Sequence, residues 1–237
     1  MEDILAQAKK VAEGAEVFML SSEETPVQFE ANRLKHIQSK QSHSVALRII
    51  KNGRVGYASA TGLDDSHELV NMAVETAQFG MLARFEFPSP ASYPQIEVFD
   101  PDVESVPIEK MVELGEELVT QVTNHTPDIV CEAGVTKSIV SVRIINSRGG
   151  QTNYRKSVFD LGIEGTLIRG TDMLFVGESQ SSCHPRLDSK EVVEVVLQQL
   201  ELAREQASAP NQQLPVILSL IHISEPTRPL YISYAVF

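Results

Sequence analysis

The chain has 237 residues, of which 42% are hydrophobic and 22% are charged, and its net charge is −12. These proportions are ordinary for a soluble globular protein. The acidity argues against nucleic acid as a partner, because neutralising phosphates requires clustered Lys and Arg. No stretch approaches the apolar length of a membrane span, which argues against a membrane as a partner too.

The N-terminus and the cysteines bear on the cellular compartment. Residues 1–10 place acids before lysines and contain no apolar core of the kind that a signal peptide requires. Cys131 and Cys183 are too few for a disulfide framework. We therefore expect a cytoplasmic protein.

The last twenty residues, Leu218 to Phe237, read as translated sequencing adapter. Back-translation of 218–228 fits the transposon end and the adapter stem of tagmentation libraries in one frame. Back-translation of 232–237 fits the adapter beyond its index, and Pro229 obeys the codon constraint that the index imposes. We expect the natural sequence to stop near Ile217, and residues 218–237 are excluded from fold reasoning.

Residues 1–84 predict a domain of helices and antiparallel strands. Helical spacing of apolar residues favours an amphipathic helix over roughly the first dozen residues. A short apolar run at 17–20 predicts a buried strand, and alternation at 27–31 predicts a half-exposed one.

A hairpin and a helix complete this predicted domain. Asn52-Gly53 lies between alternating runs at 44–50 and 55–59, which is typical of a tight hairpin because both central residues tolerate positive φ. Asp65 with Glu68 resembles a capping box, and Gly80 is expected to close the helix that this box begins.

Residues 85–104 form a predicted linker, because they crowd several prolines together. Residues 105–217 then repeat the mixture of helices and strands. The expected elements are a helix at 108–122, strands at 129–132, 138–145, 154–167 and 173–177, and a helix capped by Asp188 and Glu191 that runs to about Ala207. The predicted fold class is α+β, with two domains of antiparallel hairpins flanked by helices and joined by the linker; 218–237 is the adapter-derived segment.

Two short motifs contain residue types that can bind a metal ion. His67-Glu68 begins like a zinc-protease helix, but Asn71 and Met72 stand where a second His ligand is needed. Cys183-His184 are adjacent residues that project differently, and no partner pair lies nearby in the sequence. A loop is the better interpretation of the second motif.

Other polar residues are also better explained without a catalytic or ligand-binding role. His36 and His43 have the spacing to face each other across strands, but chance placement is the better explanation. Asp64-Asp65 and Asp100-Pro101-Asp102 are interpreted as caps or turns before they are interpreted as paired catalytic carboxylates. We therefore predict no catalytic, cofactor-binding or metal-binding residue in this chain.

The run from Val45 to Ser59, with Leu63 and the helical segment 73–77 after it, resembles the N-terminal domain of the TldD/PmbA family. Its members are also called modulators of DNA gyrase. The order of elements agrees too, from the leading helix through the linker to the strand start at 214–217. The resemblance covers the N-terminal and middle domains of the family, whereas its C-terminal domain is missing.

The resemblance implies a zinc-dependent metallopeptidase that acts on unstructured peptides. In the TldD branch a His-Glu-x-x-x-His helix comes after the Pro-Val strand, and its histidines bind zinc while its Glu activates water. The strand start at 214–217 precedes that position, so we expect zinc in the intact family complex and none on this chain. The PmbA branch, also called TldE, lacks the motif and pairs with TldD.

These features support three functional hypotheses. The leading one is a truncated subunit of a TldD/PmbA-type zinc metallopeptidase, with a family partner subunit in a homo- or heterodimer and unstructured peptides as substrates. The second is a noncatalytic PmbA/TldE-like partner that scaffolds the complex and admits substrate. The third is an unrelated binding module with a similar plan of hairpins and helices.

Overall fold

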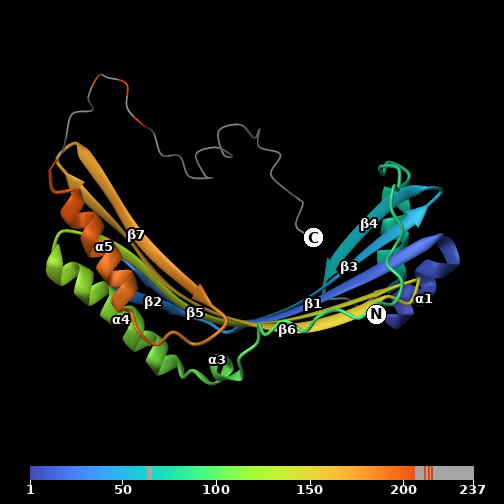
Figure 1. Ribbon diagram of the computed structural model, residues 1–237, viewed down its shortest axis with the longest axis horizontal. Helices are drawn as coiled ribbons and strands as arrows, with labels where there is room; N and C mark the ends of the chain where they lie inside the picture. Colours follow the sequence, from blue (N-terminus) through green and yellow to red (C-terminus); the bar gives the residue numbers. More distant parts are fainter. Residues whose placement is uncertain (63–65, 206–210, 212, 214, 216–237) are drawn as a thin grey trace. The chain divides into compact units, whose positions relative to one another are not determined.

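The computed structural model of the protein describes residues 1–62, 66–205, 211, 213 and 215. Met1–Ala203 forms one compact unit, which contains all of the described helices and strands (Figure 1). Several sequence predictions lie outside the described residues: the cap Asp65, the pair Asp64-Asp65, most of the strand start at 214–217 and the adapter segment 218–237.

One antiparallel sheet of seven strands has the order β4-β3-β1-β5-β6-β7, and β2 pairs with β1. The strands are β1 Gly14–Glu30, β2 Arg33–Ile37, β3 Lys40–Lys51, β4 Arg54–Thr61, β5 Val130–Asn146, β6 Gln151–Arg169 and β7 Asp172–Ser182. The described helices are α1 Glu2–Val11, α2 Ser66–Ala77, α3 Pro101–Ser105, α4 Ile108–His125 and α5 Lys190–Leu202. The α+β class with antiparallel strands is therefore confirmed. None of these helices is both long and apolar enough to cross a membrane.

The central strands β1 and β5 are longer than the sequence predicted. Each is continuous over 17 residues, where the sequence suggested two short strands. Pro26 does not end β1, because Thr25 and Pro26 lie between the residues that pair with β3 and those that pair with β2. A proline is tolerated in a strand where no neighbour needs its missing N–H.

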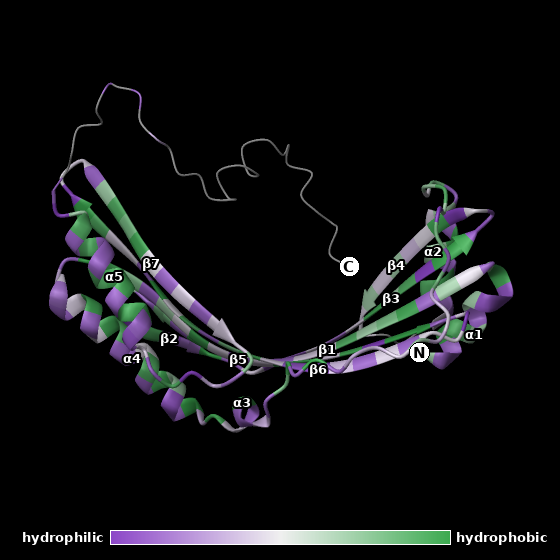
Figure 2. Ribbon diagram, in the orientation of Figure 1, coloured by the Kyte–Doolittle hydropathy of each residue, from purple (hydrophilic) through white to green (hydrophobic). Residues whose placement is uncertain are grey.

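Both helical layers cover the same face of the sheet. Between Ala15 and Phe29 the buried residues of β1 all have odd numbers, so one face of the strand is buried at both of its ends. In Figure 1, α1 and α2 cover one end, and α4 and α5 cover the other. Figure 2 shows hydrophobic and hydrophilic residues alternating along the strands, as this arrangement requires.

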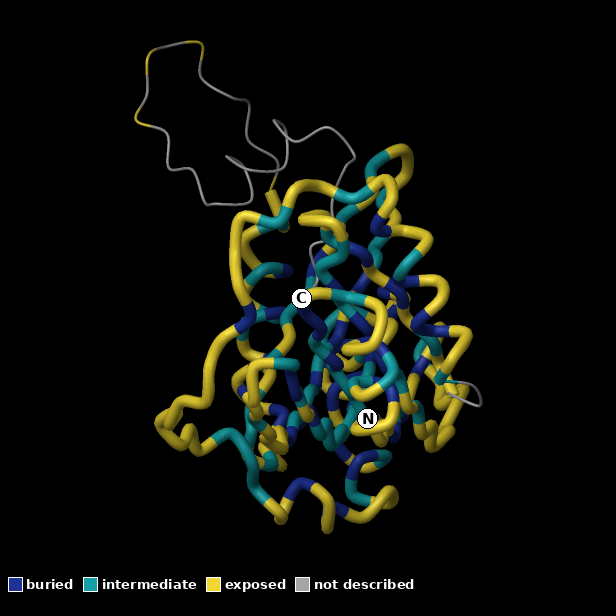
Figure 3. Tube along the Cα trace, turned by 90° about the vertical axis from the view of Figure 1, so that its right-hand side faces the viewer, coloured by how far each residue is buried: buried dark blue, intermediate teal, exposed yellow. Residues whose placement is uncertain are grey.

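The core consists of two clusters of buried residues, which Figure 3 shows as the dark segments of the trace. Phe159 and Leu118 lie in the cluster under α4 and α5, together with Val27 of β1. Leu47 and Leu69 lie in the cluster under α1 and α2, together with Ile145 of β5. Each cluster is therefore built from residues on both sides of the proline-rich segment.

The predicted hairpin at Asn52-Gly53 is confirmed. Lys51 pairs with Arg54, and the φ angles of Asn52 and Gly53 are 51° and 69°. Two consecutive positive φ angles match the right-handed twist of the flanking strands. Alternate residues of β3 are buried in the cluster that includes α2; they are Val45, Leu47 and Ile49.

The role of Gly80 differs from the prediction. The helix α2 ends at Ala77, and Gly80 is not among the glycines with positive φ. A Cβ atom at Gly80 would fall on the carbonyl oxygen of Val55. Glycine is therefore needed here for the close approach of the chain to β4 and not for a left-handed turn.

The outer strands β4 and β7 are each capped by a side chain from a helix. The hydroxyl of Thr76 in α2 accepts a hydrogen bond from the backbone N–H of Tyr57 at 2.9 Å and donates to its carbonyl at 2.8 Å. The amide of Gln199 in α5 does the same at Gly177, at 2.8 and 3.0 Å. Because open strand edges pair readily with other chains, both edges are blocked at one residue.

Residues 83–100 contain neither helix nor strand, and they pass along a free stretch of β6. Strand β7 pairs with β6 only from Phe159 onward, so the preceding residues lack a strand neighbour on that side. There the N–H of Ser157 donates to the carbonyl of Val98, and its hydroxyl accepts from the N–H of Asp100. The segment covers an edge that would otherwise be open.

Candidate functional site

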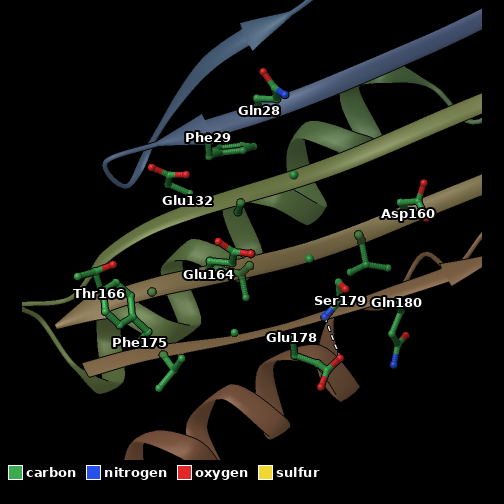
Figure 4. Close-up of a pocket in the computed structure, with 18 of the residues that line it drawn as sticks. Gln28, Phe29, Glu132, Asp160, Glu164, Thr166, Phe175, Glu178, Ser179 and Gln180 are labelled. Atoms are coloured by element: carbon green, nitrogen blue, oxygen red, sulfur yellow. Dashed lines mark hydrogen bonds between the residues drawn. The ribbon is translucent and has the colours of Figure 1, made fainter. Parts of the chain in front are cut away.

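A groove of about 1140 Å³ lies on the sheet face opposite α4 and α5. Its floor is formed by β1, β5, β6 and β7 (Figure 4). We call the sheet face that carries this groove the open face. It carries the even-numbered residues of β1, β5 and β6 and the odd-numbered residues of β7, as the strand registers require.

A row of registered residues, small on three of its four strands, crosses the floor of the groove. Gln28, Gly134, Gly162 and Ser179 are registered neighbours on β1, β5, β6 and β7. A Cβ atom added at Gly134 meets nothing within 4 Å, so that position opens into the groove. The row forms a trough that runs across the strands.

Carboxylates flank the trough on both sides. Glu132 and Glu164 face each other across β5 and β6 on one side, and Asp160 lies beside Thr136 on the other. Figure 4 shows these carboxylates standing on the same side of the sheet. The residues that line the groove include no Lys, Arg or His.

The three carboxylates have no cationic partner within the part of the chain that the structure describes. None of its ion pairs involves Glu132, Asp160 or Glu164. Like charges placed directly opposite on neighbouring strands, as Glu132 and Glu164 are, destabilise a sheet. A local arrangement that opposes folding is typical of a functional site.

The groove becomes apolar toward the β6–β7 turn. Val130, Thr166 and Phe175 form the next row beyond Glu132 and Glu164. The side chain of Phe175, on the outer strand β7, is 69% exposed. The open face therefore presents an apolar row directly beside an acidic one.

Sequence reasoning missed this groove, although a readable signal exists. Both strands repeat an acid, a glycine and a polar residue at alternate positions: Glu132, Gly134 and Thr136 in β5, and Asp160, Gly162 and Glu164 in β6. Alternate positions share a face. Neither segment alone shows that the two patterns meet in register, however, because only the strand pairing aligns them.

A second cavity of about 530 Å³ lies beside the Asn52-Gly53 hairpin. Its polar groups are already engaged: the Glu13 carboxylate accepts from the N–H groups of Asn52 and Gly53 at 2.7 and 3.1 Å, and Arg148 pairs with Glu86. The cavity is a packing seam between the hairpin and the segment at 83–100.

Most of the polar residues that the sequence offered as site candidates lie far from one another in the fold. His67 and Glu68 lie in the first turn of α2. The ring of His36 contacts Gln38, and that of His43 contacts Ser21. The two histidines do not face each other, because they pair with β1 at positions seven residues apart, 28 and 21.

Asp100 and His184 are brought together, which the sequence did not indicate. Nδ1 of His184 lies 2.7 Å from Oδ2 of Asp100, although the residues are 84 apart in sequence. The hydrogen bond from His184 and then the N–H of Asp102 lower the pKa of Asp100 below its ordinary 3.8. The pair joins the end of the 83–100 segment to the loop before α5.

This contact predicts a pH-dependent contribution to stability. Because the pKa of Asp100 is lower in the folded chain, its ionised form stabilises the fold above about pH 3.8, and this contribution is lost as the pH falls through the folded-state pKa. The difference in urea midpoint between wild type and Asp100→Asn should therefore be clear at pH 5 and should shrink toward pH 3. Asp102→Asn is the control. Equal Asp100→Asn differences at both pH values would contradict the prediction.

The described residues contain no group of three or more His, Cys, Asp or Glu side chains placed to hold a metal ion. Cys131 does not supply a thiolate, since burial raises its pKa to about 11. Cys183 is free and lies beside the His184–Asp100 pair without completing a ligand set. Zinc requires three or four converging ligands.

Comparison with known proteins identifies related sequences and folds. The family described as PmbA/TldA metallopeptidase domain 1 matches residues 15–78. An uncharacterized protein of Methanocaldococcus jannaschii is 24% identical over 210 residues, which cover 88% of this chain and 47% of that protein. The chain thus spans about half the length of this curated relative.

Solved structures share the fold. TldE from Thermococcus kodakarensis superposes with a TM-score of 0.73 at 16% identity, covering 86% of this chain and 48% of that one. A proposed modulator of DNA gyrase from Thermotoga maritima gives 0.73 at 13% identity, covering 88% and 49%. The fold is that of the TldE-like proteins. Together with the match over residues 15–78, this shared fold supports the TldD/PmbA family for this chain.

Proposed function

We propose that the chain is part of a subunit of a TldD/PmbA-type zinc metallopeptidase that degrades unstructured peptides in the cytoplasm. The observation that carries the proposal is the match of residues 15–78 to the first domain of this metallopeptidase family. A partner subunit of the same family, in a homo- or heterodimer, belongs to the proposal. The open-face groove supports it, since an exposed trough on a sheet can accommodate an extended chain.

The described residues do not fit a zinc site, because they bring no three suitable side chains together. We therefore assign them no step in peptide hydrolysis. Their contribution to the proposed function is to hold peptide and to contact the remainder of the assembly.

The likeness to TldE favours a second candidate. In this alternative the complete protein is a noncatalytic subunit that scaffolds the complex and admits substrate to a zinc-bearing partner. The fold of this chain serves either role, because both place the metal chemistry on other residues.

The decisive experiment uses the complete reading frame recovered from adapter-trimmed reads. The product is purified alone and with a family partner, and zinc per subunit, dimer mass and hydrolysis of an unfolded peptide are measured. Zinc on this subunit with chelator-sensitive hydrolysis supports the first role. Hydrolysis only in the presence of a zinc-bearing partner supports the second. A zinc-free assembly that leaves the peptide intact overturns both.

A further inference from the structure

We propose that the open-face groove binds an extended peptide segment in which Lys or Arg residues adjoin an apolar residue. The inference rests on the proposed function for the class of ligand, a peptide. It goes beyond the proposed function by locating the peptide-binding site on this chain and by naming the side chains of the peptide that the site selects.

The trough has the dimensions of a short extended peptide. Gln28, Gly134, Gly162 and Ser179 lie on four adjacent strands. Adjacent strands are about 4.8 Å apart, so the row spans about 14 Å, the length of roughly four extended residues at about 3.4 Å each. The two glycines let a peptide backbone approach the floor closely.

The charges of the groove select a cation. Residues two apart on a strand are separated by about 7 Å, so the rows with Glu132 and Glu164 and with Asp160 both lie within reach of a Lys or Arg side chain from the trough. A peptide whose backbone edge faces the floor directs successive side chains to the two rows alternately. Three carboxylates without cationic partners then meet opposite charges on both sides.

Other occupants fit less well. A second copy of the chain, with its net charge of −12, would bring like charges together, and nucleic acid would be repelled. A metal ion lacks a third ligand here. Gln199 occupies the edge of β7 at Gly177, so a peptide lies on the face of the sheet and does not extend it there as an added strand.

The apolar row supplies the second element of recognition. Val130 and Phe175 are both exposed, and their row directly adjoins Glu132 and Glu164. Covering an exposed aromatic ring favours an apolar residue next to the basic ones. The groove thus distinguishes a basic and apolar sequence from one that is only basic.

The test measures binding of a fluorescein-labelled peptide, Gly-Leu-Lys-Lys-Lys-Leu-Gly, to the full 237-residue chain by fluorescence anisotropy. Binding should weaken as salt rises. The analogue with Glu in place of Lys should not bind. Replacing both Leu residues by Ser should weaken binding. Failure of the Lys peptide to bind, or equal binding of the Glu peptide, overturns the proposal.

Two variants locate the site. Gly134→Val places a Cβ atom where nothing lies within 4 Å and narrows the trough, so the fold should be retained and binding should fall by about tenfold or more. The double change Glu132→Gln with Glu164→Gln should weaken binding by about tenfold. Its control is Glu109→Gln with Glu116→Gln, which removes two charges from α4 on the other face.

The outcomes separate this inference from the proposed function. An equal loss in the α4 control, or unchanged binding by folded Gly134→Val, overturns the groove assignment even if the complete assembly hydrolyses peptides. Binding that depends on Gly134 and on the carboxylates supports it even if no hydrolysis is found. Displacement of the peptide by micromolar Ca²⁺ or Zn²⁺ would overturn it in favour of a cation site.

Discussion

Phe159→Ala should lower the free energy of unfolding by about 3–5 kcal/mol, the range for a large aromatic side chain removed from a packed core. Phe159 is fully buried in the cluster under α4 and α5, at 0% exposure. The loss combines the lost burial of the ring with the cavity left among Leu118, Leu161 and their neighbours.

Equilibrium urea unfolding monitored by circular dichroism measures this loss. Phe175→Ala is a matched control, because it removes the same side chain from the exposed face of the same sheet. It should change the stability by no more than about 0.5 kcal/mol. A loss below about 1 kcal/mol for Phe159→Ala would show that the ring does not lie in a packed core.

Gly115→Val in α4 should lower the free energy of unfolding by about 1–3 kcal/mol. In an exposed helix the same change would be favourable by a few tenths of a kcal/mol, because glycine is a poor helix former. Here a Cβ atom would enter the ring of Phe29, which is only 3% exposed and has little room to move. Overpacking therefore outweighs helix propensity.

A double-mutant cycle tests the assigned cause. Phe29→Leu makes room beside position 115, so the loss from Gly115→Val should be smaller in that background than in the wild type. Gly134→Val serves as the control, because a Cβ atom at that position meets nothing within 4 Å. Losses that simply add in the double variant would show that Phe29 does not limit the space at Gly115.

Local signals predicted local structure well. The Asn52-Gly53 hairpin follows from two residues that tolerate positive φ, and the burial of alternate residues in β3 follows from their pattern. The continuity of β1 was not predictable in this way. Pro26 is an interruption in the sequence, and only the position of its strand neighbours shows why it is tolerated.

The candidate site depends on contacts between distant parts of the chain. Val27 of β1 pairs with Val135 of β5, more than a hundred residues later, and β6 and β7 then complete the floor of the groove. Sequence spacing identifies acids on one strand but does not align them with those on the next. The sequence likewise indicates a turn at Asp100 and a loop at His184, whereas only the fold shows that Oδ2 of Asp100 lies 2.7 Å from Nδ1 of His184.

Because helices supply the side chains that cap the outer strands, the docking of these helices protects the sheet from pairing with other chains. Gln199 can cover the edge of β7 only while α5 remains docked, and the cap of Thr76 on β4 depends on α2 in the same way. Partial detachment of either helix exposes backbone groups able to recruit another chain, although most of the sheet remains folded. The population of ordered aggregates should therefore depend on the free energy of detaching one helix, which is smaller than the free energy of global unfolding.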